Sequence, residues 1–267
     1  MAFTNGFGSR LAARVRGIGR EKIPAPILGL FAANVALIAI PIVDFGLDSP
    51  IRELRKVISL DGETTLQAWY SSMQWFCAGI LFGVFSLYAF RSRLRGFVAV
   101  AAFALACIVF SIDEIAGIHE WLGHKSDALL PGGNRQQTVL SHSGLWPFAI
   151  GVPVVAAVVV TVCRMRHLFL PLSPRALRLL ATGLVIMFTG ALLIELGANF
   201  IEKTPEHRGL YLTQLAVEEF LEMLGVSFIV WAAYELLRAH GFTLRMPASM
   251  TALSGGAPEA THGHRTG

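Results

Sequence analysis

The chain has 267 residues, of which 54% are hydrophobic and 15% charged, and its mean hydropathy is +0.58. A soluble domain usually carries about 25% charged residues. This composition therefore excludes an ordinary soluble protein and predicts one that spans a membrane several times. The net charge of +4 does not indicate a nucleic-acid partner, because the basic residues stand between hydrophobic runs, where they act as topology signals.

Six hydrophobic runs follow one another along the chain, and each is close to the roughly 20 residues that cross a bilayer as a helix. Helices are required because an open sheet in lipid would leave backbone groups without hydrogen-bond partners. The predicted fold class is an all-α polytopic membrane protein with six transmembrane helices. These are approximately Ile27–Val43, Ala68–Phe90, Phe97–Gly117, Leu145–Val162, Ala176–Phe200 and Leu215–Leu237.

The 22 Lys and Arg residues are unevenly divided between the two sides of these helices. Most of them fall in the N-terminal segment, the second and fourth loops and the C-terminal side. Because short loops rich in Lys and Arg stay in the cytoplasm, we expect both termini to be cytoplasmic. Seven basic residues fall on the other side: Arg52, Arg55, Lys56, Lys125, Arg135, Lys203 and Arg208.

The expected organisation is a basic cytoplasmic segment at 1–26, a transmembrane domain at 27–240 and a cytoplasmic tail at 241–267. The tail is small, polar and contains Gly and Pro, which predicts disorder. Cys77, Cys107 and Cys163 lie in apolar runs without a CxxC spacing. We interpret them as small buried apolar residues rather than as disulfide partners or metal ligands.

Acidic residues gather where the third, fifth and sixth predicted helices reach the outer side. Counting from the cytoplasmic arginines at ~1.5 Å per residue places Asp113, Glu195 and Glu222 at nearly one depth. An acid inside the membrane costs ~2.5–3.5 kcal/mol, so several together need protons, a cation or a water-filled cavity. The set that we expect to form one pocket is Asp113, Glu114, His119, Glu120, Glu195, Glu219 and Glu222.

The stretch around Gly117 decides whether these side chains can share a site. On an unbroken helix, Glu114 and His119 would point away from Asp113. They face one point only if the helix bends, and Gly117 is the natural position for the bend.

Carboxylates with an imidazole suit hard or borderline cations, so we expect a divalent metal, namely iron, manganese or zinc. If the protein is an enzyme, a metal-activated water would attack a lipid or other hydrophobic substrate that enters from the outer leaflet, and dioxygen chemistry at the metal is the alternative. His119, as ligand or general base, and Glu120 are then the catalytic candidates. The expected metal ligands are Asp113, Glu114, His119, Glu195, Glu219 and Glu222.

Known metal motifs are incomplete in this chain. The two histidines of HEWLGH, His119 and His124, are five residues apart, so they do not share the helix face that HExxH provides. Glu219 and Glu222 supply Glu-x-x-Glu but not the Glu-x-x-His of ferritin-like bundles. A proton- or cation-coupled transporter and an accessory or assembly subunit of a membrane complex remain alternatives.

Three short motifs together resemble an uncharacterised family of bacterial multi-pass membrane proteins. They are Trp-Tyr-Ser-Ser at 69–72, Ser-Ile-Asp-Glu-x-x-x-Ile-His-Glu at 111–120 and Glu-Glu-x-x-Glu-Met-x-Gly at 218–225. The resemblance runs from about the first helix to the sixth, and it implies that the protein lies in a bacterial inner membrane. It implies that these positions act as a unit, and it implies no activity.

Overall fold

The computed structural model describes residues 22–47, 52–60, 62, 65–201 and 204–241. Most of the expected N-terminal segment at 1–26 and all but the first residue of the expected tail at 241–267 lie outside these residues. The described residues are helical or irregular and contain no strand. Six of the helices are long and apolar enough to cross a membrane, which confirms the predicted number of spans and supports a multi-pass membrane protein.

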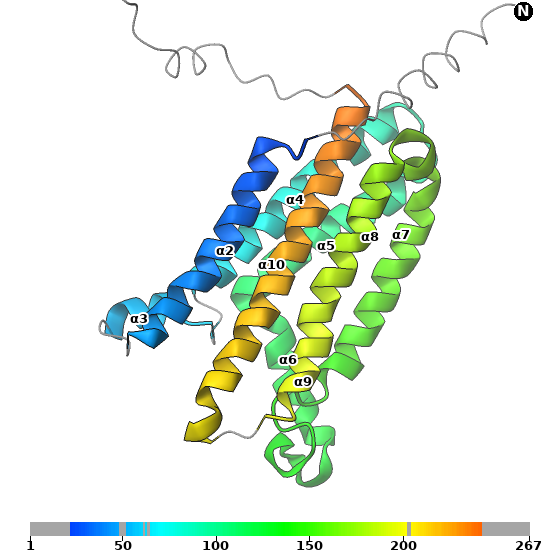
Figure 1. Ribbon diagram of the computed structural model, residues 1–267. Coiled ribbons are helices and arrows are strands. Elements are labelled where there is room, and N and C mark those ends of the chain that lie inside the picture. Colours follow the sequence, from blue (N-terminus) through cyan, green and yellow to red (C-terminus); the bar gives the residue numbers. More distant parts are fainter. Residues whose placement is uncertain (1–21, 48–51, 61, 63–64, 202–203, 242–267) are drawn as a thin grey trace, which may run out of the picture.

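The observed spans begin and end within a few residues of the predicted ones, with two exceptions: the fourth ends at Leu172 rather than at Val162, and the last begins at Arg208 rather than at Leu215 (Figure 1). Two of the spans, the fourth and the fifth, contain π-helical turns, η4 and η5. Both turns lie in the half of the span that the predicted topology places toward the outer side. The spans are α2 (Ala25–Gly46), α4 (Leu66–Arg91), α5 (Phe97–Ala116), η4 with α7 (Pro147–Gly151, Val152–Leu172), α8 with η5 and α9 (Pro174–Phe188, Thr189–Ile194, Glu195–Ala198) and α10 (Arg208–Ala239).

Shorter elements connect these spans. α3 (Arg52–Ile58) joins α2 to α4, and α6 (Ile118–Ser126) follows α5 directly. Four 3₁₀ turns complete the described chain: η1 (Asp127–Leu129), η2 (Pro131–Gly133), η3 (Arg135–Gln137) and η6 (Pro205–His207).

The last span, α10, is the central helix of the bundle, and α2, α4 and α8 pack around it (Figure 1). Two thirds of its most hydrophobic stretch is buried, a larger share than in any other described span. Its closest neighbour is α8, because Gly183 and Gly225 face each other without side chains. A Cβ built at Gly183 would lie 2.6 Å from the carbonyl oxygen of Gly225. Small residues at such contacts let helix backbones approach closely in membranes.

A polar contact inside the membrane joins α2 to this core. The Asn34 amide donates to Ser227 Oγ at 3.0 Å, and the Gln74 amide donates to Asn34 Oδ1 at 3.2 Å and to Ser227 Oγ at 2.8 Å. All three side chains are buried. Hydrogen bonds between membrane helices contribute about 0.6 kcal/mol on average, so this contact specifies which face of α2 meets the bundle more than it stabilises the fold.

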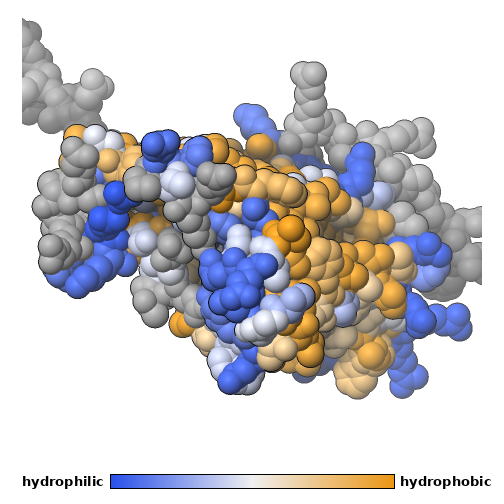
Figure 2. Space-filling view, turned by 90° about the horizontal axis from the view of Figure 1, so that it is seen from below, coloured by the Kyte–Doolittle hydropathy of each residue, from blue (hydrophilic) through white to orange (hydrophobic). Residues whose placement is uncertain are grey.

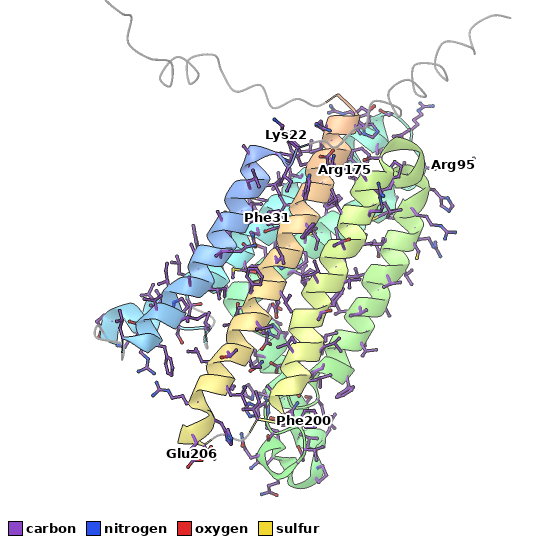
Figure 3. The ribbon with its side chains drawn as sticks, in the orientation of Figure 1. Lys22, Phe31, Arg95, Arg175, Phe200 and Glu206 are labelled. Atoms are coloured by element: carbon purple, nitrogen blue, oxygen red, sulfur yellow. The ribbon has the colours of Figure 1, made fainter. Side chains whose placement is uncertain are left out.

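The two ends of the bundle differ in charge. Lys22, Arg95 and Arg175 lie at the end where the described chain begins and finishes, whereas Phe200 and Glu206 lie at the opposite end (Figure 3). The opposite end also carries α6, α9 and the 3₁₀ turns (Figure 1). We call it the α6 end, and all the acidic residues singled out from the sequence lie in its half of the bundle.

Candidate functional site

One cavity of about 480 Å³ lies in the half of the bundle at the α6 end, between α5, α6, η4, η5 and α10. We call it the carboxylate cavity. Every site residue expected from the sequence lines it, and Glu218 joins them. Its acidic lining is Asp113, Glu114, Glu120, Glu195, Glu218, Glu219 and Glu222.

The deeper wall of the carboxylate cavity is apolar and aromatic. Trp75 comes from α4, Phe110 from α5, Val154 from α7, and Met187 and Phe188 from α8. The cavity therefore has two zones, with an apolar zone toward the middle of the bundle and a carboxylate zone nearer the α6 end. Its volume lies within the 300–1,000 Å³ range of small-molecule pockets.

The acids of α10 reach the cavity because η5 leaves its backbone close to that helix. A Cβ built at Gly190 would lie 2.9 Å from the carbonyl oxygen of Glu218 and 3.0 Å from Glu222 Cγ. The second π-helical segment, η4, meets η5 across the cavity wall, where Leu192 Cδ2 would lie 2.6 Å from a Cβ at Gly151. π-helical turns inside α-helices are frequent at functional sites, and here two of them line one cavity.

Asp113 and His119 form a hydrogen-bonded pair on the cavity wall. Asp113 Oδ2 lies 2.7 Å from His119 Nδ1, and Asp113 Oδ1 accepts the backbone N–H of His119 at 2.9 Å. This contact is possible because α5 ends at Ala116 and Gly117 adopts a left-handed conformation with φ 56°. The bend at Gly117 expected from the sequence is confirmed. The pairing itself was not expected, because beyond the bend the helical spacing no longer holds.

Trp146, which also lines the cavity, makes an aromatic contact with this pair. The His119 ring lies 5.3 Å from the ring of Trp146, whose indole N–H donates to Glu195 Oε1 at 3.4 Å. Burial by itself would lower the pKa of His119, but the hydrogen bond and charge of Asp113, together with Glu120 and Glu114, raise it above the usual value. Because Asp113 engages Nδ1, the nitrogen left for chemistry in the cavity is Nε2.

Gly117 is the first position where a single substitution tests this geometry. An alanine there has to adopt φ 56°, which costs roughly 1–2 kcal/mol for a residue with a Cβ. We expect Gly117→Ala to lower the free energy of unfolding by about that amount and to weaken the Asp113–His119 pair. Chemical denaturation in detergent and the pKa of His119 from histidine NMR measure the two effects. Unchanged stability and an unchanged pKa would contradict the left-handed turn.

The acids of α10 and α8–α9 lie close enough to interact with one another. Glu218 is within hydrogen-bond reach of Glu195 and also accepts from the Gln214 amide. Glu219 is an electrostatic neighbour of Glu114 and Glu120. Glu222 is a neighbour of Glu114, Glu195, Glu218 and Glu219. The cavity therefore concentrates negative charge that only protons or a cationic ligand can compensate at close range.

Glu218 was not among the residues expected to form the pocket, and yet it is 9% exposed and therefore almost fully buried. Its position near the start of the sixth predicted span is also typical of an acid at the membrane interface. The signal that identifies it is the i, i+4 spacing to Glu222 and to Gln214, which places all three on one face of α10.

Basic side chains contribute little to the described lining. Arg135 is the only Lys or Arg there, and its guanidinium bonds to Asp127 and to the carbonyl oxygen of His142. His142 also lines the cavity. It donates its backbone N–H to Asn199 Oδ1 at 2.9 Å, and its Nε2 lies 3.1 Å from the Ile201 carbonyl oxygen. These contacts tie the loop after α6 to the end of α9 and form the rim of the cavity.

The expected metal ligands all line the carboxylate cavity, but the described side chains are not grouped around one point. Within the described residues, no group of three or more His, Cys, Asp or Glu side chains is arranged to hold a metal ion. Both oxygens of Asp113 already bond to His119, one to its ring and one to its backbone N–H. The divalent metal expected from the sequence stays a prediction.

Comparison with known proteins identifies a family but no activity. A family model described as Domain of unknown function (DUF8692) matches residues 27–237, from the first described span to the last. No curated protein and no solved structure matches the chain. The matched range contains the whole carboxylate cavity, so the cavity is part of what the family model covers.

Proposed function

Because the chain belongs to the family of this domain of unknown function, we propose a function from its cavity: the protein binds an amphiphilic molecule that carries a positive charge. The charged group would lie among the carboxylates, and the apolar part would lie against Trp75, Phe110 and Met187. The observation that carries the proposal is one cavity whose described lining holds seven acids, an apolar aromatic zone and a single Lys or Arg that is already bonded to Asp127.

Electrostatics favour a cation over other ligands. Several carboxylates in a poorly hydrated site repel one another, and an ammonium group relieves that repulsion while it regains polar contacts. Aromatic rings within about 6 Å add cation–π attraction, and Trp75, Phe110 and Trp146 line the same cavity. With an anionic or purely apolar ligand, protonation would be the only close-range compensation for the carboxylates.

The proposal includes the topology. We propose that both termini are cytoplasmic, that the membrane is a bacterial inner membrane and that the cavity opens to the outer face. The basic residues at the end opposite the α6 end support this orientation through the positive-inside rule.

A metal-dependent enzyme that acts on a lipid or other hydrophobic substrate is the second candidate. One observation favours it: Asp113 holds Nδ1 of His119, which is how carboxylates orient metal-ligating histidines. The same pair equally suits a general base. Two further functions would use the same cation-binding cavity. In one the protein transports the bound cation, and in the other a basic loop of a partner protein occupies the cavity.

The decisive experiment compares two probes of similar size and opposite charge, 4-phenylbutylamine and 4-phenylbutyrate, by calorimetric titration of the protein in lipid nanodiscs. We expect the amine to bind and the acid not to bind. Glu222→Gln and Glu218→Gln should each weaken amine binding by roughly tenfold, because each removes one carboxylate next to the ammonium group; tenfold corresponds to 1.4 kcal/mol.

The control variant is Glu53→Gln, which removes an exposed acid of α3 that pairs with Lys56 at 3.2 Å, away from the cavity. It should bind the amine as the wild type does. Equal binding of both probes, or no effect of the cavity variants, would overturn the proposal. Elemental analysis of the same samples tests the second candidate: stoichiometric metal in the wild type, lost in Glu222→Gln and Glu195→Gln, would favour the metal-dependent enzyme.

A further inference from the structure

The helix α6 exposes its apolar face. Ile118, Trp121 and Leu122, at i, i+3 and i+4, are 42%, 58% and 39% exposed. The opposite face packs on Trp146, through the His119 ring and through Gly123, where a Cβ would lie 3.0 Å from Trp146 Cβ. A surface helix of a water-soluble protein buries its apolar stripe, so α6 has the reverse arrangement.

This apolar face continues the lipid-facing side of the preceding span. On α5, Leu105, Val109 and Ile112 lie at i, i+4 and i+7 and are all exposed. The chain turns at Gly117, and the exposed apolar residues go on through Trp121 to Leu129, which is 80% exposed. Figure 2, seen from the α6 end, shows a broad hydrophobic surface directly beside hydrophilic groups.

The remaining exposed face of α6 is polar. Glu120 and His124, at i and i+4, are exposed. The Lys125 ammonium lies 5.7 Å from the centre of the Trp121 ring. Tryptophan is enriched at the boundary between lipid and water, and lysine extends its charged end from apolar surroundings to water. A helix with one packed, one apolar and one polar face suits the bilayer interface.

We propose that α6 lies in the bilayer interface at the α6 end, with Ile118, Trp121 and Leu122 in contact with lipid and with Glu120 and His124 toward water. The occupant of its exposed apolar face is the lipid leaflet itself. Because Ile118 and Leu122 also line the carboxylate cavity, its mouth borders the bilayer there. An amphiphile then reaches the cavity from the membrane; only this last consequence rests on the proposed function.

Spin labels attached to single cysteines test the position of α6 in nanodiscs, in a background where Cys77, Cys107 and Cys163 are replaced by alanine. We expect labels at 121 and 122 to collide more often with oxygen, which concentrates in lipid, than with a water-soluble nickel complex. Labels at 120 and 124 should show the reverse order. These four positions lie on one short helix and differ only in the face that they occupy.

A label at position 121 that meets the nickel complex as often as the one at 124 would overturn the proposal. Spin–spin broadening at 121 would overturn it too, because a second copy would then cover the face. Should the cysteine-free protein not fold, brominated lipids answer the same question with native tryptophans: Trp121→Phe is expected to remove part of the quenching. None of these results depends on the affinity for 4-phenylbutylamine, so a failure here is separate from a failure of the proposed function.

Discussion

Replacing Gly225 by alanine is expected to lower the free energy of unfolding by about 3 kcal/mol, the upper end of the range for overpacked cores. A Cβ at this position would lie 2.5 Å from Met187 Cβ, 2.6 Å from the backbone nitrogen of Met187 and 2.6 Å from the carbonyl oxygen of Gly183. None of these atoms can rotate away, because they belong to the backbone or are attached directly to it. Relief requires that α8 move away from α10.

That movement would also reach the carboxylate cavity. Gly190, two turns along the same span from Gly183, meets Glu218 and Glu222 at the cavity wall. We therefore expect Gly225→Ala to weaken binding of 4-phenylbutylamine as well as stability. Unfolding by sodium dodecyl sulfate, followed by tryptophan fluorescence, measures the first effect, and calorimetry measures the second.

Gly83→Ala on α4 is the matched control, because no atom outside its own helix lies within 4 Å of a Cβ there. Alanine is about 1 kcal/mol better than glycine in a helix, so this variant should be as stable as the wild type or slightly more so. Unfolding of Gly225→Ala at the same detergent concentration as Gly83→Ala would contradict the close approach of α8 and α10.

Asp113→Asn is expected to lower the pKa of His119, because it removes the carboxylate that raises it. The measurement is NMR of the protein labelled at histidine, with the His119 signal assigned from His119→Gln. Without the negative charge, burial of the ring dominates and favours the neutral imidazole. A pKa that does not change in Asp113→Asn would contradict the pairing at 2.7 Å.

The same substitution gives a signed prediction for stability. A folded-state pKa above the unfolded one means that protonated His119 stabilises the fold fully below about pH 6.5 and that this contribution is lost as pH rises through the folded pKa. The pair is partly exposed, so solvent screening limits its contribution to the free energy of unfolding to about 1 kcal/mol. Asp113→Asn should therefore be less stable than the wild type at pH 5.5, and the difference should shrink at pH 9. Denaturation at both values checks this, and a difference that grows with pH would contradict it.

The candidate site shows where helical periodicity stops being informative. Asp113 and Glu114 could be placed from the sequence, because they lie on the unbroken part of a span whose direction the basic loops predict. The partner of Asp113 could not be placed, because one left-handed residue at Gly117 redirects the chain and brings His119 back over the end of α5. The bend was visible in the sequence as a glycine, but its angle was not.

The contacts made by the acids on α10 likewise could not be predicted from the sequence. The π-helical turns η4 and η5 shift the register of two spans, so that Glu195 meets Glu218, while Gly190 lies between Glu218 and Glu222. Neither Thr189–Ile194 nor Pro147–Gly151 carries a pattern that separates π from α turns, since both read as continuous apolar helix.

The sequence by itself determined the membrane character, the six spans and the half of the bundle that collects the acids. These follow from runs of apolar residues long enough to cross a bilayer, and from the cost of unpaired backbone groups in lipid, both of which are local properties. Only the tertiary structure decided that the acids share one cavity with an aromatic zone, that Asp113 holds His119 and that α6 turns its apolar face outward. Those facts depend on helix packing, and here packing is set by small residues such as Gly183 and Gly225 whose partners lie far away in the chain.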